Sequence, residues 1–192
     1  MNRTTLAIGF GAILLASSLL ALNQAQAQAQ PKRDDAVYAA AETNRADAIA
    51  LLKEIVNIDS GTGDIAGGNR VLDVLEGRLK AMGAELRREP AEVPALPDNL
   101  VATFRGTGKG RILLIAHVDT VFGPGVAAKR PFRIEGSRAY GPGVSDEKAG
   151  VVNAIMALKL LRDTGFKNFA TITLLLETSE ERGSPGTMKL IK

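Results

Sequence analysis

Two short, strongly apolar runs constrain the fold of this chain more than any other feature of its sequence. They span residues 112–116 and 171–176, and polar or charged residues follow each of them. Runs of this kind are typical of strands that are buried on both faces of a parallel sheet. Side chains that follow such strands lie at the carboxyl edge of the sheet, where α/β proteins form their sites. The runs therefore predict both a fold class and the position of a site.

Three segments carry apolar residues at helical spacing. The first covers residues 46–56 and is expected to begin before Tyr38. The second has its apolar face over residues 71–82, and Gly83 is placed to end it. The third runs from about residue 148 to residue 164. Each is predicted to be an amphipathic helix that packs on the sheet.

Shorter elements complete the predicted fold. Residues 84–89 are expected to form an edge strand, and residues 99–105 form a further strand. A hairpin is predicted from residues 132–135 and 138–140, while residues 186–192 look like the opening of another helix. Because helices alternate with apolar strands, the sequence predicts an α/β domain with a mostly parallel sheet flanked by helices.

The first 29 residues have the pattern of a secretion signal rather than of a globular domain. Arg3 precedes an uncharged stretch, residues 4–22, and small-x-small cleavage sites follow it, up to Ala29. A membrane anchor is the alternative, since the apolar stretch is nearly long enough to span a bilayer. Cleavage would leave residues 30–192 as one domain. We therefore expect a periplasmic or secreted protein with no membrane contact after cleavage.

Composition narrows the chemistry that is open to this chain. It has 192 residues, a formal charge of +3, no cysteine and a single histidine. The lack of cysteine excludes disulfides and thiolate ligands, so His and carboxylate side chains are the available metal ligands. Lys and Arg are dispersed apart from residues 129–133, which we expect to form a solvated loop. With no Trp and 4% aromatic residues, a nucleic-acid partner is not expected.

The single histidine, His117, directly follows the first apolar run, and Asp119 lies two residues further on. Side chains alternate along a strand, so these two should point to the same side. A carboxylate in that position can hold one imidazole nitrogen while the other binds a metal ion. A hydrogen-bonded structural histidine is the alternative.

Three more carboxylates are candidates for the same site. Asp146 follows a glycine-rich turn, where it could cap a helix or bridge two cations. Glu180 and Glu181 follow the second apolar run, as a solvated turn or as a functional pair. As a pair, one would bind metal while the other would take a proton from water.

Taken together, His117-x-Asp119, residues 141–150 and residues 180–184 resemble the M20 family of zinc peptidases. Residues 121–132 look most like glutamate carboxypeptidases of the carboxypeptidase G2 type within that family. The resemblance implies a periplasmic hydrolase that cleaves C-terminal glutamate from folates and similar acyl-glutamates. Its substrate would be a small molecule or peptide with a C-terminal carboxylate.

The resemblance also implies a role for each candidate residue. His117 would bind one Zn²⁺ ion, Asp146 would bridge two, and Glu181 would bind the second. Asp119 would orient His117, and Glu180 would be the general base. An M20 aminoacylase or amidohydrolase of other specificity is an alternative, and so is a non-catalytic metal-binding scaffold.

Two further expectations concern the complete metal site. The resemblance implies a cis peptide bond between Asp146 and Glu147. It also implies further zinc ligands, a lid and a dimerisation domain that these 192 residues do not supply. We therefore expect the chain to be the amino-terminal part of such a catalytic domain, to bind zinc weakly and to hydrolyse little or nothing. A homodimer is expected only for the full-length form.

Overall fold

The computed structural model describes residues 33–191. The expected secretion signal, residues 1–29, lies outside the described residues. Among the helices that the structure does describe, none is both long enough and apolar enough to span a bilayer.

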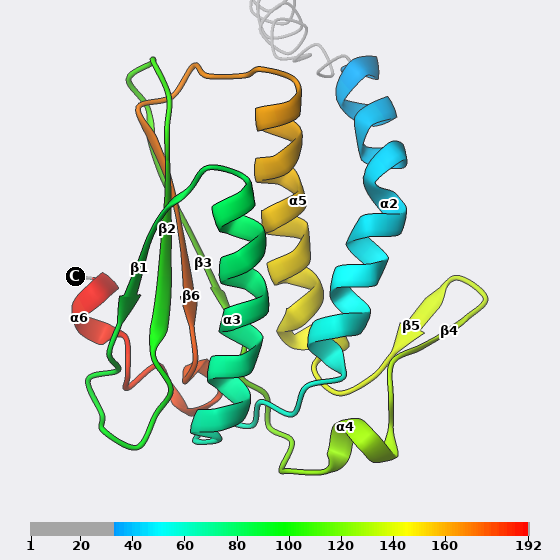
Figure 1. Ribbon diagram of the computed structural model, residues 1–192, viewed down its shortest axis with the longest axis vertical. Helices are drawn as coiled ribbons and strands as arrows, with labels where there is room; N and C mark the ends of the chain where they lie inside the picture. Colours follow the sequence, from blue (N-terminus) through cyan, green and yellow to red (C-terminus); the bar gives the residue numbers. More distant parts are fainter. Residues whose placement is uncertain (1–32, 192) are drawn as a thin grey trace, which may run out of the picture. The chain divides into compact units, whose positions relative to one another are not determined.

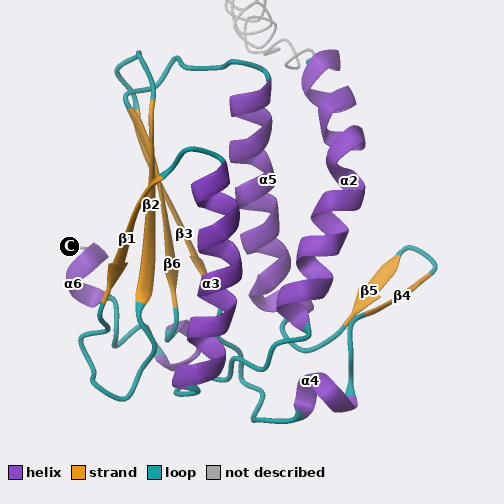
Figure 2. Cartoon of the chain, in the orientation of Figure 1, coloured by secondary structure: helices purple, strands orange, loops and turns teal. Residues whose placement is uncertain are grey.

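The described residues form a four-stranded sheet that helices cover on one face (Figures 1 and 2). Across the sheet the strands are β1 (Glu85–Glu89), β2 (Asn99–Arg105), β6 (Thr171–Glu177) and β3 (Arg111–His117). Each of these strands lies within two residues of its predicted position, and β1 is at an edge as expected. The prediction of strands from apolar runs is therefore confirmed.

The prediction of a mostly parallel sheet was wrong, because the sheet is mixed. Only β3 and β6 run parallel, whereas β1 pairs with β2, and β2 with β6, in antiparallel register. Parallel neighbours need a long crossover, usually through a helix. A helix separates β3 from β6, but β1, β2 and β3 follow one another through loops. The alternation of helix and strand thus holds for only one pair of neighbours.

Three helices build the core with the covered face of the sheet. They are α2 (Asp35–Val56), α3 (Ile65–Ala81) and α5 (Ala149–Asp163), as the helical spacing predicted. The carboxylate of Asp64 caps α3 by accepting the N–H of Gly67 at 2.8 Å. Leucines on β6 and on all three helices have no exposed surface or almost none, and each contributes roughly 1.5–3 kcal/mol by burial.

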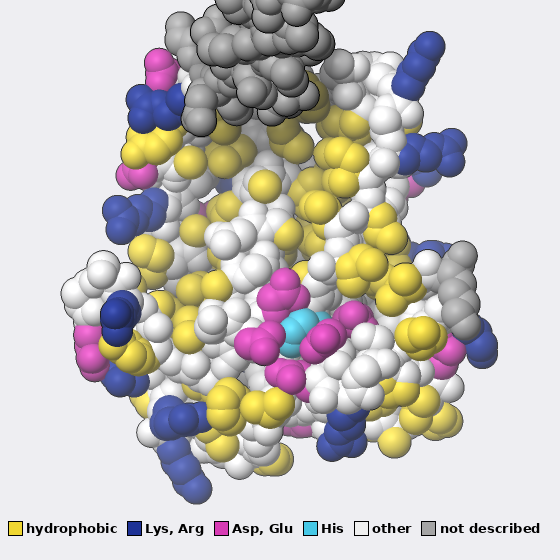
Figure 3. Space-filling view, turned by 180° about the vertical axis from the view of Figure 1, so that it is seen from behind, with side chains coloured by type: hydrophobic (Ala, Val, Ile, Leu, Met, Phe, Trp, Pro, Cys, Tyr) yellow, Lys and Arg dark blue, Asp and Glu magenta, His cyan; other side chains and the backbone are white. Residues whose placement is uncertain are grey.

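Strand β3 is not buried on both faces, contrary to the expectation from its apolar run. Ile112, Leu113 and Ile115 are 48%, 51% and 42% exposed. The reason is position: β3 lies at the edge of the sheet, and helices cover one face only. Seen from behind, this side of the molecule shows hydrophobic side chains at the surface (Figure 3). Only the end of β3 near His117 is well enclosed.

The smaller elements follow the predicted pattern. A hairpin of β4 (Arg133–Glu135) and β5 (Arg138–Tyr140) forms a separate two-stranded sheet, apart from the four-stranded one (Figure 2). Short helices, α4 (Val126–Lys129) and α6 (Met188–Ile191), lie before the hairpin and at the end of the described chain. The predicted hairpin and final helix are both present.

Candidate metal centre

The site is built where β3 and β6 end side by side. In their parallel register His117 pairs with Glu177, so the residues after both strands emerge at the same edge of the sheet. A short turn, η1 (Val144–Lys148), precedes α5 at this edge, and another, η2 (Glu180–Arg182), follows β6. Segments far apart in the sequence therefore bring their polar side chains to one place.

Carboxylates surround the imidazole of His117 (Figure 3). Its Nδ1 lies 3.3 Å from an oxygen of Asp119 and its Nε2 lies 3.1 Å from Asp146. Oxygens of Glu147 and Glu180 are 3.8 and 3.6 Å from Nε2. His117 and Asp119 point the same way, as the spacing predicted.

The donor atoms of His117, Asp146 and Glu181 all lie within 4.8 Å of one another. Bonds from zinc to nitrogen and oxygen ligands are about 2.0–2.2 Å long, so modest side-chain rotations suffice to bring these atoms onto a shared ion. One imidazole with two carboxylates is also a donor set that zinc accepts. The three residues fit a metal ion, whereas the division of ligands between two ions stays a prediction.

Asp119 organises the buried part of the site. Its carboxylate accepts the hydroxyl of Thr62 at 2.6 Å and the backbone N–H groups of Glu180 and Glu181 at 3.1 and 3.3 Å. With His117 Nδ1, these donors satisfy a carboxylate that is almost fully buried. Burial opposes ionisation, but the hydrogen bonds from His117 and Thr62 lower the pKa of Asp119. Asp119 therefore links the end of β3 to η2.

The surrounding acids decide the charge of the imidazole. Burial opposes protonation, but the hydrogen bond and charge of Asp119, together with Asp146 and Glu147, raise the pKa of His117 to about 9. Burial and the neighbouring charge of Asp146 raise the pKa of Glu181. In the metal-free chain, a proton on His117 thus balances part of the negative charge, which a cation can do instead.

Comparison with known proteins agrees with this geometry. Residues 113–192 match the peptidase family M20/M25/M40. Over its whole length the chain is 37% identical to carboxypeptidase G2 from Pseudomonas sp. (strain RS-16), of which it covers 44%. The chain belongs to the M20 peptidase family.

Other M20 relatives carry different names. The chain is 35% identical, over 70% of its length, to a succinyl-diaminopimelate desuccinylase from Gluconobacter oxydans, and covers 35% of that protein. Human carnosine dipeptidase 1 shares the fold, with a TM-score of 0.70 and 21% identity over 82% of this chain and 37% of the other. The chain thus spans less than half the length of the curated relatives that it matches.

Two polar residues of this M20 site escaped the sequence analysis. Glu147 accepts the backbone N–H of His117 at 2.9 Å, so it fixes the end of β3. Its position beside Asp146 was a signal that could have found it. Thr62 donates to Asp119 across 57 residues of sequence, and no local pattern announces such a contact.

The turn that carries Asp146 needs an unusual backbone. The peptide bond between Asp146 and Glu147 is cis, as the family resemblance implied. Gly143 has φ +71°, and a Cβ there would lie 2.5 Å from the side chain of Thr120. Any larger residue would therefore be strained and would push η1 away from the loop after Asp119.

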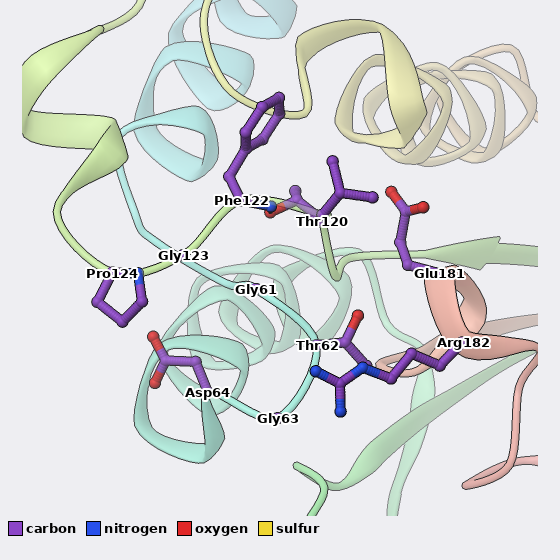
Figure 4. Close-up of a pocket in the computed structure, with 11 residues that line it drawn as sticks. Gly61, Thr62, Gly63, Asp64, Thr120, Phe122, Gly123, Pro124, Glu181 and Arg182 are labelled. Atoms are coloured by element: carbon purple, nitrogen blue, oxygen red, sulfur yellow. The ribbon is translucent and has the colours of Figure 1, made fainter.

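Two cavities flank the M20 metal site. The larger, about 580 Å³, lies between residues 61–64, residues 120–124 and the pair Glu181 and Arg182 (Figure 4). The smaller, about 230 Å³, is bounded by Gly141 and residues 143–146 and shares Val121, Phe122 and Glu181 with the first. Glu181 therefore lines both cavities.

Proposed function

We propose that this chain supplies the metal site and the general base of a zinc-dependent metallo-carboxypeptidase. The proposed reaction releases a C-terminal amino acid, glutamate, from acyl-glutamates or folate-like substrates. The observation that carries the proposal is the convergence of His117, Asp146 and Glu181, whose donor atoms lie within 4.8 Å of one another beside the half-exposed carboxylate of Glu180.

Each residue has a distinct part in this proposal. His117, Asp146 and Glu181 would hold zinc, Asp146 would bridge two ions, and Asp119 would keep the imidazole oriented through Nδ1. Bound zinc supplies a Lewis acid that polarises the substrate carbonyl. Glu180 would accept a proton from the attacking water and return it to the leaving amine. Two observations support this role: its side chain is half-exposed, and its backbone N–H is held by the carboxylate of Asp119.

The name and extent of one relative support the substrate class. Carboxypeptidase G2 is 37% identical across the whole of this chain, and the paired cavities offer room for an acyl group and an amino acid. A second candidate is an amidohydrolase of the desuccinylase kind, because that relative is 35% identical over 70% of the chain. The amino-terminal pattern supports a further proposal, that the protein acts in the periplasm or outside the cell.

Zinc titration tests the metal site directly. Isothermal titration calorimetry of the purified chain should show zinc binding, and Asp146→Asn and Glu181→Gln should each weaken it at least about 10-fold. Glu54→Gln is the matched control, since Glu54 is an exposed carboxylate on α2. Equal affinity in all four proteins would contradict the proposed site.

A chimera tests the reaction. This chain would replace the corresponding 44% of carboxypeptidase G2, which supplies the remainder of an M20 enzyme. The chimera should release glutamate from an N-acyl-glutamate, and Glu180→Gln should slow it about 10²–10⁴-fold without loss of zinc. Full activity of the Glu180→Gln chimera would refute the role of Glu180. Preference for a succinylated amine would favour the second candidate.

A further inference from the structure

Lys148 is the largest fully buried side chain among the described residues, and the chemistry proposed above does not use it. It is 1% exposed. Its Nζ donates to the carbonyl oxygens of Ile55 and Ile58, each at 2.9 Å. Removing an ammonium group from water carries a large free-energy penalty, so an apolar side chain of similar size would be expected to stabilise the fold more at this position. The charge is retained in a place where it has specific partners.

These partners lie at the end of a distant helix. Ile55 is in the last turn of α2, where carbonyl groups lack helical partners and carry the negative end of the helix dipole. Lys148 reaches that end across more than 90 residues of sequence. It is itself the last residue of η1, the turn that carries Asp146 and Glu147. The ammonium therefore ties the ligand-bearing turn to α2.

The chain just after the end of α2 also contacts the loop after Asp119, part of which lines both cavities. Asp59 follows the carbonyl groups that Lys148 binds, and its carboxylate accepts the N–H groups of Gly125 and Ala127 at 2.7 and 2.8 Å. Those two residues continue the segment that starts at Val121 and Phe122, beside Glu181. Three segments thus meet around one buried cation: the end of α2, η1, and the loop after Asp119.

We propose that Lys148 is a positioning residue of the metal centre, which holds Asp146 toward His117 and fixes the cavity wall through the end of α2 and Asp59. The inference rests on the proposed metal site and adds to it a residue that touches neither metal nor substrate. Removal of the ammonium would free η1 to shift, so the distance between Asp146 and His117 Nε2, now 3.1 Å, would no longer be maintained.

The test compares Lys148→Met with a core truncation at the other end of the molecule. Lys148→Met should weaken zinc binding about 10–100-fold, the range seen when groups that support metal ligands are lost. It should also change the visible absorption of bound Co²⁺, which reports ligand geometry. Leu79→Ala, at the far end of α3, destabilises the fold without touching the site, so its zinc affinity and Co²⁺ spectrum should stay like those of the unchanged chain.

A measurement on the unchanged chain covers the case in which Lys148→Met does not fold. Hydrogen exchange with and without zinc should show added protection at residues 55–59 and 121–127, although neither segment supplies a ligand. Protection confined to the ligands and their neighbours would overturn the role of Lys148, as would equal zinc affinity and an equal Co²⁺ spectrum in Lys148→Met. A chain that binds no zinc at all would refute the proposed function and this role together.

Discussion

The histidine side and the carboxylate side of the metal centre differ sharply in burial. His117 and Asp119 are 5% and 2% exposed, and each has more than one hydrogen-bond partner. The side chains of Asp146 and Glu180 are 75% and 49% exposed. The first pair is held at the enclosed end of β3, whereas the second lies on two short turns, η1 before α5 and η2 after β6.

This difference in burial indicates which part of the site the fold holds in place by itself and which part a bound cation would have to stabilise. The polar groups of the buried pair have protein partners, so the pair should keep its geometry whether or not metal is bound. The exposed acids crowd together, and like charges at this range repel one another. A cation removes that repulsion, so the exposed side should respond to metal much more than the buried side does.

The largest effect is expected when the buried side is broken. Asp119→Ala removes the carboxylate that accepts from four donors, His117 Nδ1 among them, which should lower the free energy of unfolding by about 3–5 kcal/mol. Urea denaturation followed by circular dichroism measures it. Asp73→Ala, a change of an exposed carboxylate on α3, should cost less than about 1 kcal/mol. Equal midpoints for the two variants would contradict the role of Asp119 in holding the buried side together.

The exposed side should behave in the opposite way. Asp146→Asn should leave the stability of the metal-free chain within about 0.5 kcal/mol, because its side chain is mostly in water. The same change should weaken zinc binding at least about 10-fold. Thermal denaturation without and with zinc separates the two quantities. A marked loss of stability in the metal-free protein would show that Asp146 supports the fold rather than the metal.

The same contrast explains how far the sequence could predict the fold. Apolar runs and helical spacing located β2, β6, α3 and α5 because burial leaves a direct mark on residue choice. The exposure of one face of β3 could not be predicted, because a continuous apolar run does not indicate whether another element covers both faces of the strand. Sheet order depends on which strands a helix separates, and the run β1, β2, β3 lacks that helix.

The candidate site shows a parallel limit. His117, Asp146 and Glu181 could be predicted because each follows an apolar strand or a glycine-rich turn. Thr62 and Lys148 could not, because each acts through a contact that spans more than 50 residues. Their side chains are of types usually found in solvated loops, and only the tertiary structure shows what they touch. The candidate ligands can thus be recognised from the local sequence, whereas the residues that contact them across the fold cannot.

The pH dependence of stability sharpens the comparison further. The pKa of His117 is raised from 6.5 to about 9 in the folded chain, so its protonation stabilises the metal-free fold. That stabilisation should be complete below about pH 6.5 and lost as the pH rises through about 9. The difference in urea midpoint between the unchanged chain and His117→Gln, measured from pH 6 to pH 10, isolates it. A difference that does not change with pH would contradict the raised pKa.

The smallest effect is expected at Glu181, where stability and metal binding should move in opposite directions. Burial and the charge of Asp146 raise the pKa of this carboxyl, so its ionised form is penalised at neutral pH and stability falls as the pH rises above the ordinary value of 4.5. Glu181→Gln should therefore stabilise the metal-free chain, by about 0.5 kcal/mol after solvent screening, while it weakens zinc binding. Thermal denaturation with and without zinc shows both signs in one experiment. A Glu181→Gln variant that is less stable both with and without zinc would contradict this prediction. It would mean that Glu181, like His117 and Asp119, supports the fold itself.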